Sequence, residues 1–236
     1  MTPETALALA PDMAPELSGR HNSALAEHLA RLTDHCIRMR FKRNEVLAKE
    51  GEAITQIHKI QSGCVRLCHR FSDGRRPIAD FMFAGDILGL STASTYALAA
   101  EAVTPITVLA YSRTQFNRFT EGNGRVRTEI MSHLTQALSR TQEHLFLLNC
   151  LGARERMAAF LLRLYRHGQF VYGDRIDLPM GRQDLADYLG LTVETVCRAL
   201  AYLRRQAVIE TRNAQLVVIK DLPRLIAAAE GRELSV

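Results

Sequence analysis

The sequence predicts an α+β fold with three parts: an N-terminal β-roll, one long helix and a C-terminal winged helix-turn-helix. Short β-rich segments separated by glycines fill the stretch from residue 36 to 111. From residue 125 onward, apolar residues recur every three or four positions, which is the spacing of a helix face. Near the C-terminus, two short amphipathic segments flank a glycine-containing turn, as in a helix-turn-helix.

These patterns divide the chain into four segments. The first residues are rich in alanine and proline and lack a clear period, so we interpret them as a mobile tail. A helix over 23–35 then leads into the roll. The expected segments are the tail at 1–23, a sensor-like β-roll domain at 24–124, the long helix at 125–151 and the winged helix-turn-helix domain at 152–236.

The composition favours a cytoplasmic protein with a packed core. Hydrophobic residues make up 47% of the 236 residues, and the net charge of +5 favours a polyanionic partner if it is localised. The five cysteines follow no regular spacing, so we expect free thiols in a reducing compartment and no disulfide framework. No apolar run approaches the roughly 20 residues of a membrane helix, and the first residues lack the basic region of a signal peptide. We therefore expect no membrane partner.

The stretch from 36 to 111 predicts a roll of short strands. The segments VLAKEGE, QIHKIQSG, CVRLCHRF, FMFAGDILGL and ITVLAYS are β-rich and alternate with turn residues. The segment SDGR at 72–75 lies between two β-rich runs, and Asp-Gly suits a tight turn with positive φ. The sequence therefore predicts a hairpin whose tip lies near Gly74.

The long helix at 125–151 carries a heptad pattern. Residues recur at alternating spacings of three and four over about three heptads, with Arg, Gln and Glu outside this seam. A helix packed on its own domain would also have an apolar face, but a sustained seam favours a coiled coil with a second copy. The residues expected at this homodimer interface are Met131, Leu134, Leu138, Thr141, Leu145 and Leu148.

The segment after Gly152 predicts the winged domain. A core-facing helix in ARERMAAFLLRLYRHG stops at Gly168, and a short β-excursion follows. RQDLADYLG predicts a short helix, and a turn at 190–192 leads to a second helix that ends near Arg205. VIETR and QLVVIKD, joined at 213–214, predict a closing hairpin or wing, and a last helix covers 222–230.

The second helix of this motif has two distinct faces on a helical wheel. The residues that cluster in one quadrant and should face the core are Val193, Val196, Leu200 and Leu203. The residues that cluster on another side are Glu194, Arg198, Ala201 and Arg205, with Cys197 at the near edge. Thr192 is placed to cap the helix, so this patch lies near the helix N-terminus.

The chemistry of Glu194 and Arg198 suits base recognition. The two are four residues apart, so their side chains are neighbours. An arginine can donate two hydrogen bonds to guanine O6 and N7 in the major groove, and a glutamate can accept one from cytosine N4. A surface ion pair would have the same spacing, but the helix-turn-helix context favours base reading. Cys197 is a third candidate base contact. The expected phosphate contacts are Arg182, Thr192, Thr195, Arg204 and Arg205.

These segments together resemble the CRP/FNR superfamily of bacterial transcription regulators, whose first domain is a cyclic-nucleotide-binding-like jelly roll. The resemblance begins at about residue 25 and is most specific in DLADYLGLTVETVCRAL, which is similar to the FixK and FNR branches and their E-x-x-S-R pattern. It implies a homodimeric activator that binds a TTGA-N6-TCAA-like palindrome, in which Glu194 and Arg198 read the G·C pair of each half-site. It also implies control of low-oxygen, denitrification or nitrogen-fixation genes.

The resemblance further implies a contact between the roll and RNA polymerase. The basic turn at 70–76 is a candidate surface for this contact, and a solvated hairpin tip is an equally good interpretation of the same residues.

A cyclic-nucleotide effector is not expected. In the superfamily, that site needs an arginine beside a small polar residue, after a turn of the Gly-Glu-Leu type. The corresponding turn here is FAGDILGL, and the segment STASTYALAAEAVT after it contains no arginine or lysine. A buried phosphate without a cation is costly.

A cofactor or metal is not expected either. An FNR-type iron–sulfur cluster needs four thiolates, three of them close together near the N-terminus, and the first 35 residues contain no cysteine. The remaining candidates for a ligand set are Cys36, Cys64 and Cys68 with His58 or His69. Buried cysteines are mostly small hydrophobic residues. A haem or iron–sulfur gas sensor of the same superfamily is the alternative.

Cys197 stands where the E-x-x-S-R pattern has serine. Oxidation of this thiol to a sulfinic acid would add bulk and negative charge opposite a DNA phosphate. The sequence therefore leaves two interpretations open, a redox-tuned DNA contact and a passive substitution.

Two other functional classes fit the sequence less well. A thiol enzyme with Cys197 as nucleophile would need a histidine base and an orienting carboxylate, and no motif around the eight histidines supplies them. A module that binds only a protein partner does not explain the basic second helix. We therefore expect a DNA-binding regulator and not an enzyme.

Overall fold

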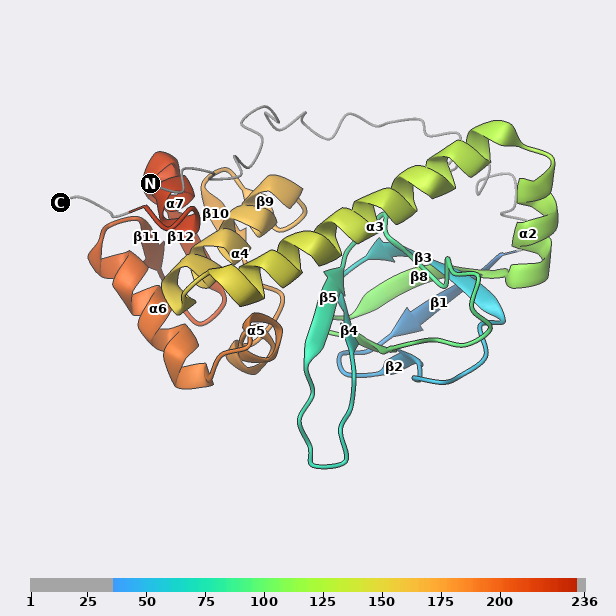
Figure 1. Ribbon diagram of the computed structural model, residues 1–236, viewed down its shortest axis with the longest axis horizontal. Coiled ribbons are helices and arrows are strands. Elements are labelled where there is room, and N and C mark those ends of the chain that lie inside the picture. The colour runs from blue at the N-terminus through green and yellow to red at the C-terminus, as the bar shows by residue number, and fades with distance from the viewer. Residues whose placement is uncertain (1–35, 233–236) are drawn as a thin grey trace, which may run out of the picture.

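The computed structural model describes residues 36–232, so the predicted tail at 1–23 and the predicted helix at 23–35 both lie outside the described residues. Strands β1 to β8 form a roll, and the long helix α3 leads from the roll to a C-terminal domain of helices and short strands (Figure 1). This is the predicted α+β architecture. Within residues 36–232, no helix is long and apolar enough to cross a membrane.

The roll consists of two four-stranded antiparallel sheets, with strand orders β1-β8-β3-β6 and β2-β7-β4-β5. Its strands are β1 (Cys36–Phe41), β2 (Val46–Ala48), β3 (Gln56–Ser62), β4 (Val65–Cys68), β5 (Ile78–Met82), β6 (Ile87–Leu88), β7 (Ala99–Ala102) and β8 (Ile106–Ser112). Both sheets contribute to one apolar core, in which Ile60, Val65, Ala100 and Val108 are at most 1% exposed.

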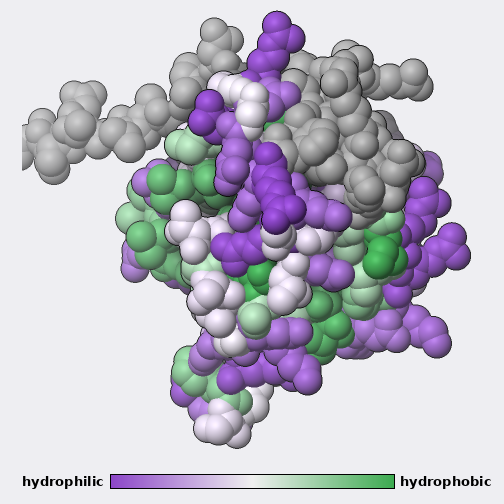
Figure 2. Space-filling model, turned by 90° about the vertical axis from the view of Figure 1, so that its right-hand side faces the viewer, coloured by the Kyte–Doolittle hydropathy of each residue, from purple (hydrophilic) through white to green (hydrophobic). Residues whose placement is uncertain are grey.

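Two glycines have structural roles in the roll. Gly74 has a φ of +89° at the tip of the β4–β5 hairpin, which confirms the predicted Asp-Gly turn. The hairpin projects below the body of the molecule, with hydrophilic and apolar side chains at its tip (Figure 2). Gly89 has a φ of +92°, and a Cβ there would lie 2.9 Å from the carbonyl oxygen of Gln56. Larger residues are therefore disfavoured at Gly89.

Helices α2 (Arg113–Glu121) and α3 (Gly124–Cys150) follow the last strand of the roll. Asn123 caps α3, because its side chain accepts hydrogen bonds from the N–H groups of Arg125 and Val126 at 3.1 and 3.3 Å. Val126 is fully buried in a cluster with Tyr111 and Phe116, which attaches the start of α3 to the roll. The helix agrees with the predicted range of 125–151 to within one residue.

The C-terminal domain contains the predicted β-excursion, helix-turn-helix and wing. Its elements are α4 (Ala153–His167), β9 (Val171–Tyr172), β10 (Arg175–Asp177), α5 (Arg182–Leu189), α6 (Val193–Arg205), β11 (Ile209–Thr211), β12 (Leu216–Ile219) and α7 (Leu222–Ala229). Strand β12 pairs with both β11 and β10, which joins the wing to the excursion in one sheet. Gly168 ends α4 in the left-handed conformation, as predicted.

The hydrophobic core of the C-terminal domain continues into the roll. The ring of Phe81 on β5 lies 5.2 Å from that of Tyr188 on α5 and 6.1 Å from that of Phe160 on α4. Phe83 lies 5.7 Å from Phe170 on the other side of the junction. The roll and the helix-turn-helix therefore pack against each other directly, and α5 is the helix of the motif that faces the roll.

Candidate nucleic-acid interface

The turn between α5 and α6 has the geometry that the sequence predicts. Gly190 ends α5 in the left-handed conformation, with a φ of +62°. The N–H of Leu191 donates to the carbonyl of Ala186 at 3.0 Å, and the Thr192 side chain accepts from the N–H of Thr195 at 3.2 Å. Thr192 is therefore the N-cap of α6, and the exposed residues that follow it lie near the positive end of the helix dipole.

Helix α6 separates buried from exposed residues largely as the helical wheel predicts. Val196, Leu200 and Leu203 are buried, whereas Val193 is only half-buried. Ala201 is half-buried and does not belong to the exposed face. The exposed polar side chains and the exposed thiol of α6 are those of Glu194, Cys197, Arg198, Arg204 and Arg205.

Glu194 and Arg198 lie one helical turn apart, and no ion pair joins them although the structure describes both. Arg198 instead donates from Nη2 to the hydroxyl of Thr195 at 2.9 Å. The pKa of Glu194 is lowered by hydrogen bonds from its own backbone N–H and from the Thr192 hydroxyl, and further by the charge of Arg198. Both charged groups are therefore exposed at the start of α6 and accessible to base edges.

The predicted phosphate contacts have different environments. Arg182 is the first residue of α5 and is half-buried, and its Nη1 atom is inaccessible and has no hydrogen-bond partner among the described residues. Burial lowers the pKa of Arg182, while the nearby Cys197 thiol acts in the opposite direction. Arg204 and Arg205 are exposed in the last turn of α6, and Thr192 and Thr195 already take part in the cap.

The wing adds one basic residue that the sequence analysis did not single out. Arg212 follows β11 and lies 3.5 Å from Glu210. The Asn213 side chain accepts hydrogen bonds from the N–H groups of Gln215 and Leu216 at 2.8 and 2.7 Å, which orders the tip. The sequence feature that could have identified Arg212 is its position directly before a turn that contains asparagine.

Comparisons with known proteins agree with this geometry. Residues 155–228 match the Crp-like helix-turn-helix domain, and residues 38–123 match the cyclic nucleotide-binding domain. The nitrogen fixation regulation protein FixK of Bradyrhizobium diazoefficiens is 35% identical over 78% of this chain and 76% of its own length. This chain belongs to the CRP/FNR family of transcription regulators.

Other relatives of this CRP/FNR regulator support the same assignment. The transcriptional activatory protein AadR of Rhodopseudomonas palustris is 34% identical over 82% of this chain and 80% of its own length. The structure of FixK2 from Bradyrhizobium japonicum has a TM-score of 0.78 and 31% identity, and the match covers 82% of this chain and 96% of that one. The predicted family and fold are therefore confirmed, and the relatives are DNA-binding regulators and not enzymes.

The basic turn at 70–76 differs from the surface expected from the sequence. The side chain of Arg76 is only 18% exposed, and its guanidinium binds Asp184 and Asp187 on α5. Arg70, although 60% exposed, binds Glu101, and Arg75, 73% exposed, pairs with Asp73 at the tip. The expectation of an exposed basic turn is therefore wrong at Arg76, because nearby carboxylates draw its side chain toward α5.

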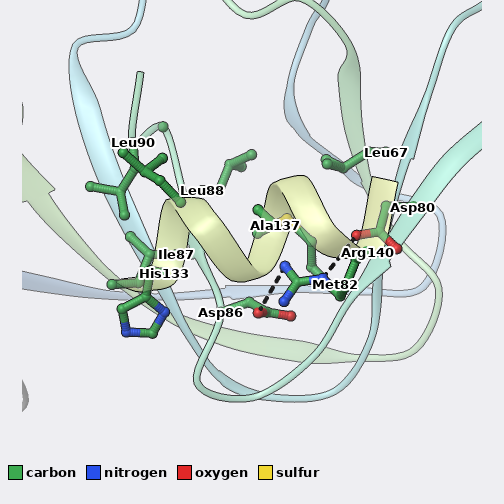
Figure 3. Close-up of a pocket in the computed structure, with 12 residues that line it drawn as sticks. Leu67, Asp80, Met82, Asp86, Ile87, Leu88, Leu90, His133, Ala137 and Arg140 are labelled. Atoms are coloured by element: carbon green, nitrogen blue, oxygen red, sulfur yellow. Dashed lines mark hydrogen bonds and ion pairs between the residues drawn. The ribbon is translucent and has the colours of Figure 1, made fainter. Parts of the chain in front are cut away.

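The CRP/FNR regulator has a cavity of about 220 Å³ between the roll and α3 (Figure 3). The lining is largely apolar, but it includes one arginine, Arg140, which comes from α3 and so lies outside the segment that the sequence analysis searched for a cation. Arg140 lies 3.4 Å from Asp80 and 3.5 Å from Asp86 (Figure 3). A phosphate in this cavity would therefore have to compete with two carboxylates for the only arginine in its lining.

The cysteines of the regulator occupy separate environments. Cys64 and Cys68 are fully buried, and burial raises the pKa of Cys64 well above its usual range and that of Cys68 to about 11. Cys36 lies on β1 beside Tyr111. Within residues 36–232, no three His, Cys, Asp or Glu side chains are grouped to hold a metal ion. Cys197 differs from the buried thiols because it is exposed on α6.

Proposed function

We propose that this regulator binds a TTGA-N6-TCAA-like palindrome as a homodimer and activates low-oxygen, denitrification or nitrogen-fixation genes without a cyclic-nucleotide effector. The observation that carries the proposal is the exposure of Glu194 and Arg198, one turn apart and not paired with each other, at the start of α6. Relatives named for nitrogen fixation regulation and anaerobic regulation support the choice of genes. Arg140, held between two aspartates, supports the absence of a phosphate-bearing effector.

Base reading is tested by fluorescence anisotropy with two duplexes, the palindrome and a version in which the G·C pair of each half-site is replaced by A·T. Arg198→Ala should weaken binding to the palindrome by about 1–3 kcal/mol and have little effect on the altered duplex. Arg204→Ala is the matched control, because an arginine that contacts phosphate should weaken both duplexes equally. Equal losses on both duplexes for Arg198→Ala would contradict base reading.

The proposed homodimer rests on the outer face of α3. Four apolar seam residues are exposed in this chain, with Met131 at 61%, Leu134 at 40%, Leu138 at 59% and Leu145 at 62%, and Thr141 is exposed as well. A row of apolar side chains along a helix gains about 25 cal/mol for each Å² that it removes from water. Two copies of α3 side by side would bury this row and place two α6 helices for the two half-sites of a palindrome. Leu148 is half-buried against its own domain and contributes less.

Cys197 tunes DNA binding through its redox state in this proposal. It is exposed on α6 and next to Arg198 in the sequence, and the half-buried Arg182 guanidinium lies close to it. A sulfinate at Cys197 would place a negative charge where a DNA phosphate approaches, and it would attract Arg182 away from that phosphate. Reduced protein would then be the form that binds.

RNA polymerase is the second macromolecular partner in the proposal, and the tip of the β4–β5 hairpin is the surface. Phe71 is 44% exposed there, and the Arg75 guanidinium lies 4.9 Å from its ring centroid. We expect Phe71→Ala to leave DNA affinity unchanged and to lower transcription from a target promoter with purified RNA polymerase several-fold, as loss of one exposed aromatic contact should. Unchanged transcription would exclude this surface.

A further inference from the structure

A cluster of six charged residues joins the roll to the helix-turn-helix. It is balanced, with three guanidinium groups and three carboxylates: Arg66, Arg70, Arg76, Glu101, Asp184 and Asp187. We call this set the ionic cluster. Its inner members are almost inaccessible, because Glu101 is 0%, Arg66 4% and Asp184 6% exposed.

The roll side of the ionic cluster is built around Glu101 on β7. Arg66 on the neighbouring strand β4 binds one carboxylate oxygen with Nη2 at 2.7 Å, and Arg70 binds the other with Nη2 at 2.5 Å. Burial alone would raise the pKa of Glu101, but the hydrogen bonds and charges of these arginines lower it. Glu101 therefore stays ionised and holds Arg66 in place.

Arg66 and a further arginine, Arg76, reach across to α5. Arg66 extends Nη1 to Asp184 Oδ1 at 3.2 Å, and Arg76 binds the same oxygen with Nη2 at 2.5 Å. Arg76 Nη2 also lies 3.1 Å from Asp187 Oδ2, one turn further along α5. Two successive turns of the first helix of the motif are therefore bound to the β4–β5 hairpin.

A second contact fixes the end of α5. The ring of Tyr188 stacks on that of His144 from α3 with centroids 4.0 Å apart, and His144 Nε2 lies 2.8 Å from the Tyr188 carbonyl oxygen. The ionic cluster binds α5 one turn earlier, at Asp184, so polar contacts hold this helix to the rest of the protein at two points.

Stability alone does not explain a buried ionic cluster. Desolvation of buried charges offsets much of their attraction, and well-packed apolar residues in their place are often as stable or more so. Ion pairs do impose direction, because a bidentate guanidinium binds a carboxylate only in a narrow range of orientations. The cluster is therefore better suited to orient α5 than to stabilise the fold.

We infer that Arg66, Arg76 and Asp184 are positioning residues for DNA recognition, which fix the angle of α6 relative to α3 and so set the spacing between half-sites that the dimer accepts. The inference rests on the proposed function. Helix α5 packs on α6 in one buried core, so a fixed α5 fixes α6. In a symmetric dimer the two recognition helices must be separated by about one DNA turn, roughly 34 Å. A spacer that is one base pair longer moves a half-site by about 3.4 Å.

The test uses the full-length protein and anisotropy with four duplexes. Three contain both half-sites, with the palindrome's own spacer, one base pair fewer or one base pair more, and the fourth contains a single half-site. Wild type should prefer its own spacer by roughly tenfold or more, which corresponds to 1.4 kcal/mol. Arg76→Gln and Asp184→Asn should reduce this ratio to about threefold or less (roughly 0.6 kcal/mol), with unchanged affinity for the single half-site.

Arg75→Gln is the matched control, because it removes the same charge from the neighbouring residue, which contacts Asp73 and not α5. It should keep the wild-type preference for spacing. Arg76→Lys retains the charge and should restore part of the preference. If Asp184→Asn does not fold, Arg76→Gln decides alone, since Arg76 lies at the more exposed edge of the cluster.

Two results would overturn the inference. One is an unchanged spacer preference in Arg76→Gln. The other is an equal loss of affinity for all four duplexes together with a lower melting temperature, which would show that the cluster only supports the fold. A wild-type protein that binds the palindrome no better than random DNA would instead refute the proposed function, and the two failures are therefore distinguishable.

Discussion

The helix-turn-helix has two charged surfaces of opposite character. Toward the roll, Asp184 is 6% exposed and is bound by two guanidinium groups. Toward solvent, α6 exposes Glu194 and Arg198 with no ion pair between them. The charges that orient the motif are thus neutralised inside the protein, whereas those that suit a nucleic acid have no opposite charge bound to them in the free chain.

The outer face of α3 is exposed to solvent like the outer face of α6, but its exposed side chains are apolar instead of charged. Leu138 and Leu145 are about as exposed as the polar residues around them. Most apolar side chains of this size elsewhere are packed in the cores of the roll and the C-terminal domain, with single exceptions such as Ile37 and Phe71. The inward surfaces are therefore covered within one chain, whereas under the proposed function the exposed surfaces of α3 and α6 are covered by a second copy and by DNA.

The largest effect should come from breaking the inward surface. Arg66→Ala removes the most buried cation of the cluster and leaves Glu101 and Asp184 only the more exposed Arg70 and Arg76, so we expect a loss of about 3 kcal/mol in the free energy of unfolding. Arg75→Ala removes an exposed arginine from the same hairpin and should change stability by less than about 0.5 kcal/mol. Urea unfolding followed by circular dichroism measures both. A difference below about 1 kcal/mol between the two variants would mean that the buried and the exposed arginine contribute about equally to stability.

The sequence predicts the exposed surface of α6 better than the buried surface of α5 that packs on the roll. The faces of α6 follow from the helical period, and Gly190 and Thr192 mark the turn and the cap by residue type alone. Strand assignment in the roll follows from β-rich segments and glycines in the same local way. Each of these sequence patterns is local, because it lies within about one or two helical turns, or one or two strands, of the structural feature that it predicts.

The buried side depends on contacts between distant parts of the chain. Arg66 meets Glu101 across 35 positions and Asp184 across 118. Arg140 reaches the cavity from α3, 60 positions from its partner Asp80. A single sequence contains no local period that pairs such residues, so Arg76 is expected at an exposed tip when its position in the sequence alone is considered.

A smaller effect should follow from changing the apolar surface of α3. Leu138→Glu places a charge at the centre of the proposed seam, where two copies would face each other, and we expect the dimer dissociation constant to rise at least about hundredfold, or 2.7 kcal/mol. Gln136→Glu adds the same charge to an exposed position outside the seam and should leave dimerisation unchanged. Sedimentation velocity over a concentration series compares the two. Dimers of equal strength in both variants would assign the seam to another role.

The smallest effect should come from one thiol on the solvent face. Peroxide should weaken binding of the wild-type protein to the palindrome by roughly tenfold (about 1.4 kcal/mol), because oxidised Cys197 is bulkier and more acidic next to Arg198. Cys197→Ser should be insensitive, and Cys150→Ser should respond like wild type, because Cys150 is exposed on α3 and far in the sequence from α6. Gel shifts before and after dithiothreitol distinguish sulfenic acid and disulfide, which are reversible, from sulfinic acid, which is not. An equal response of wild type and Cys197→Ser would make Cys197 a passive substitution, and the solvent face would then recognise DNA through its fixed charges alone.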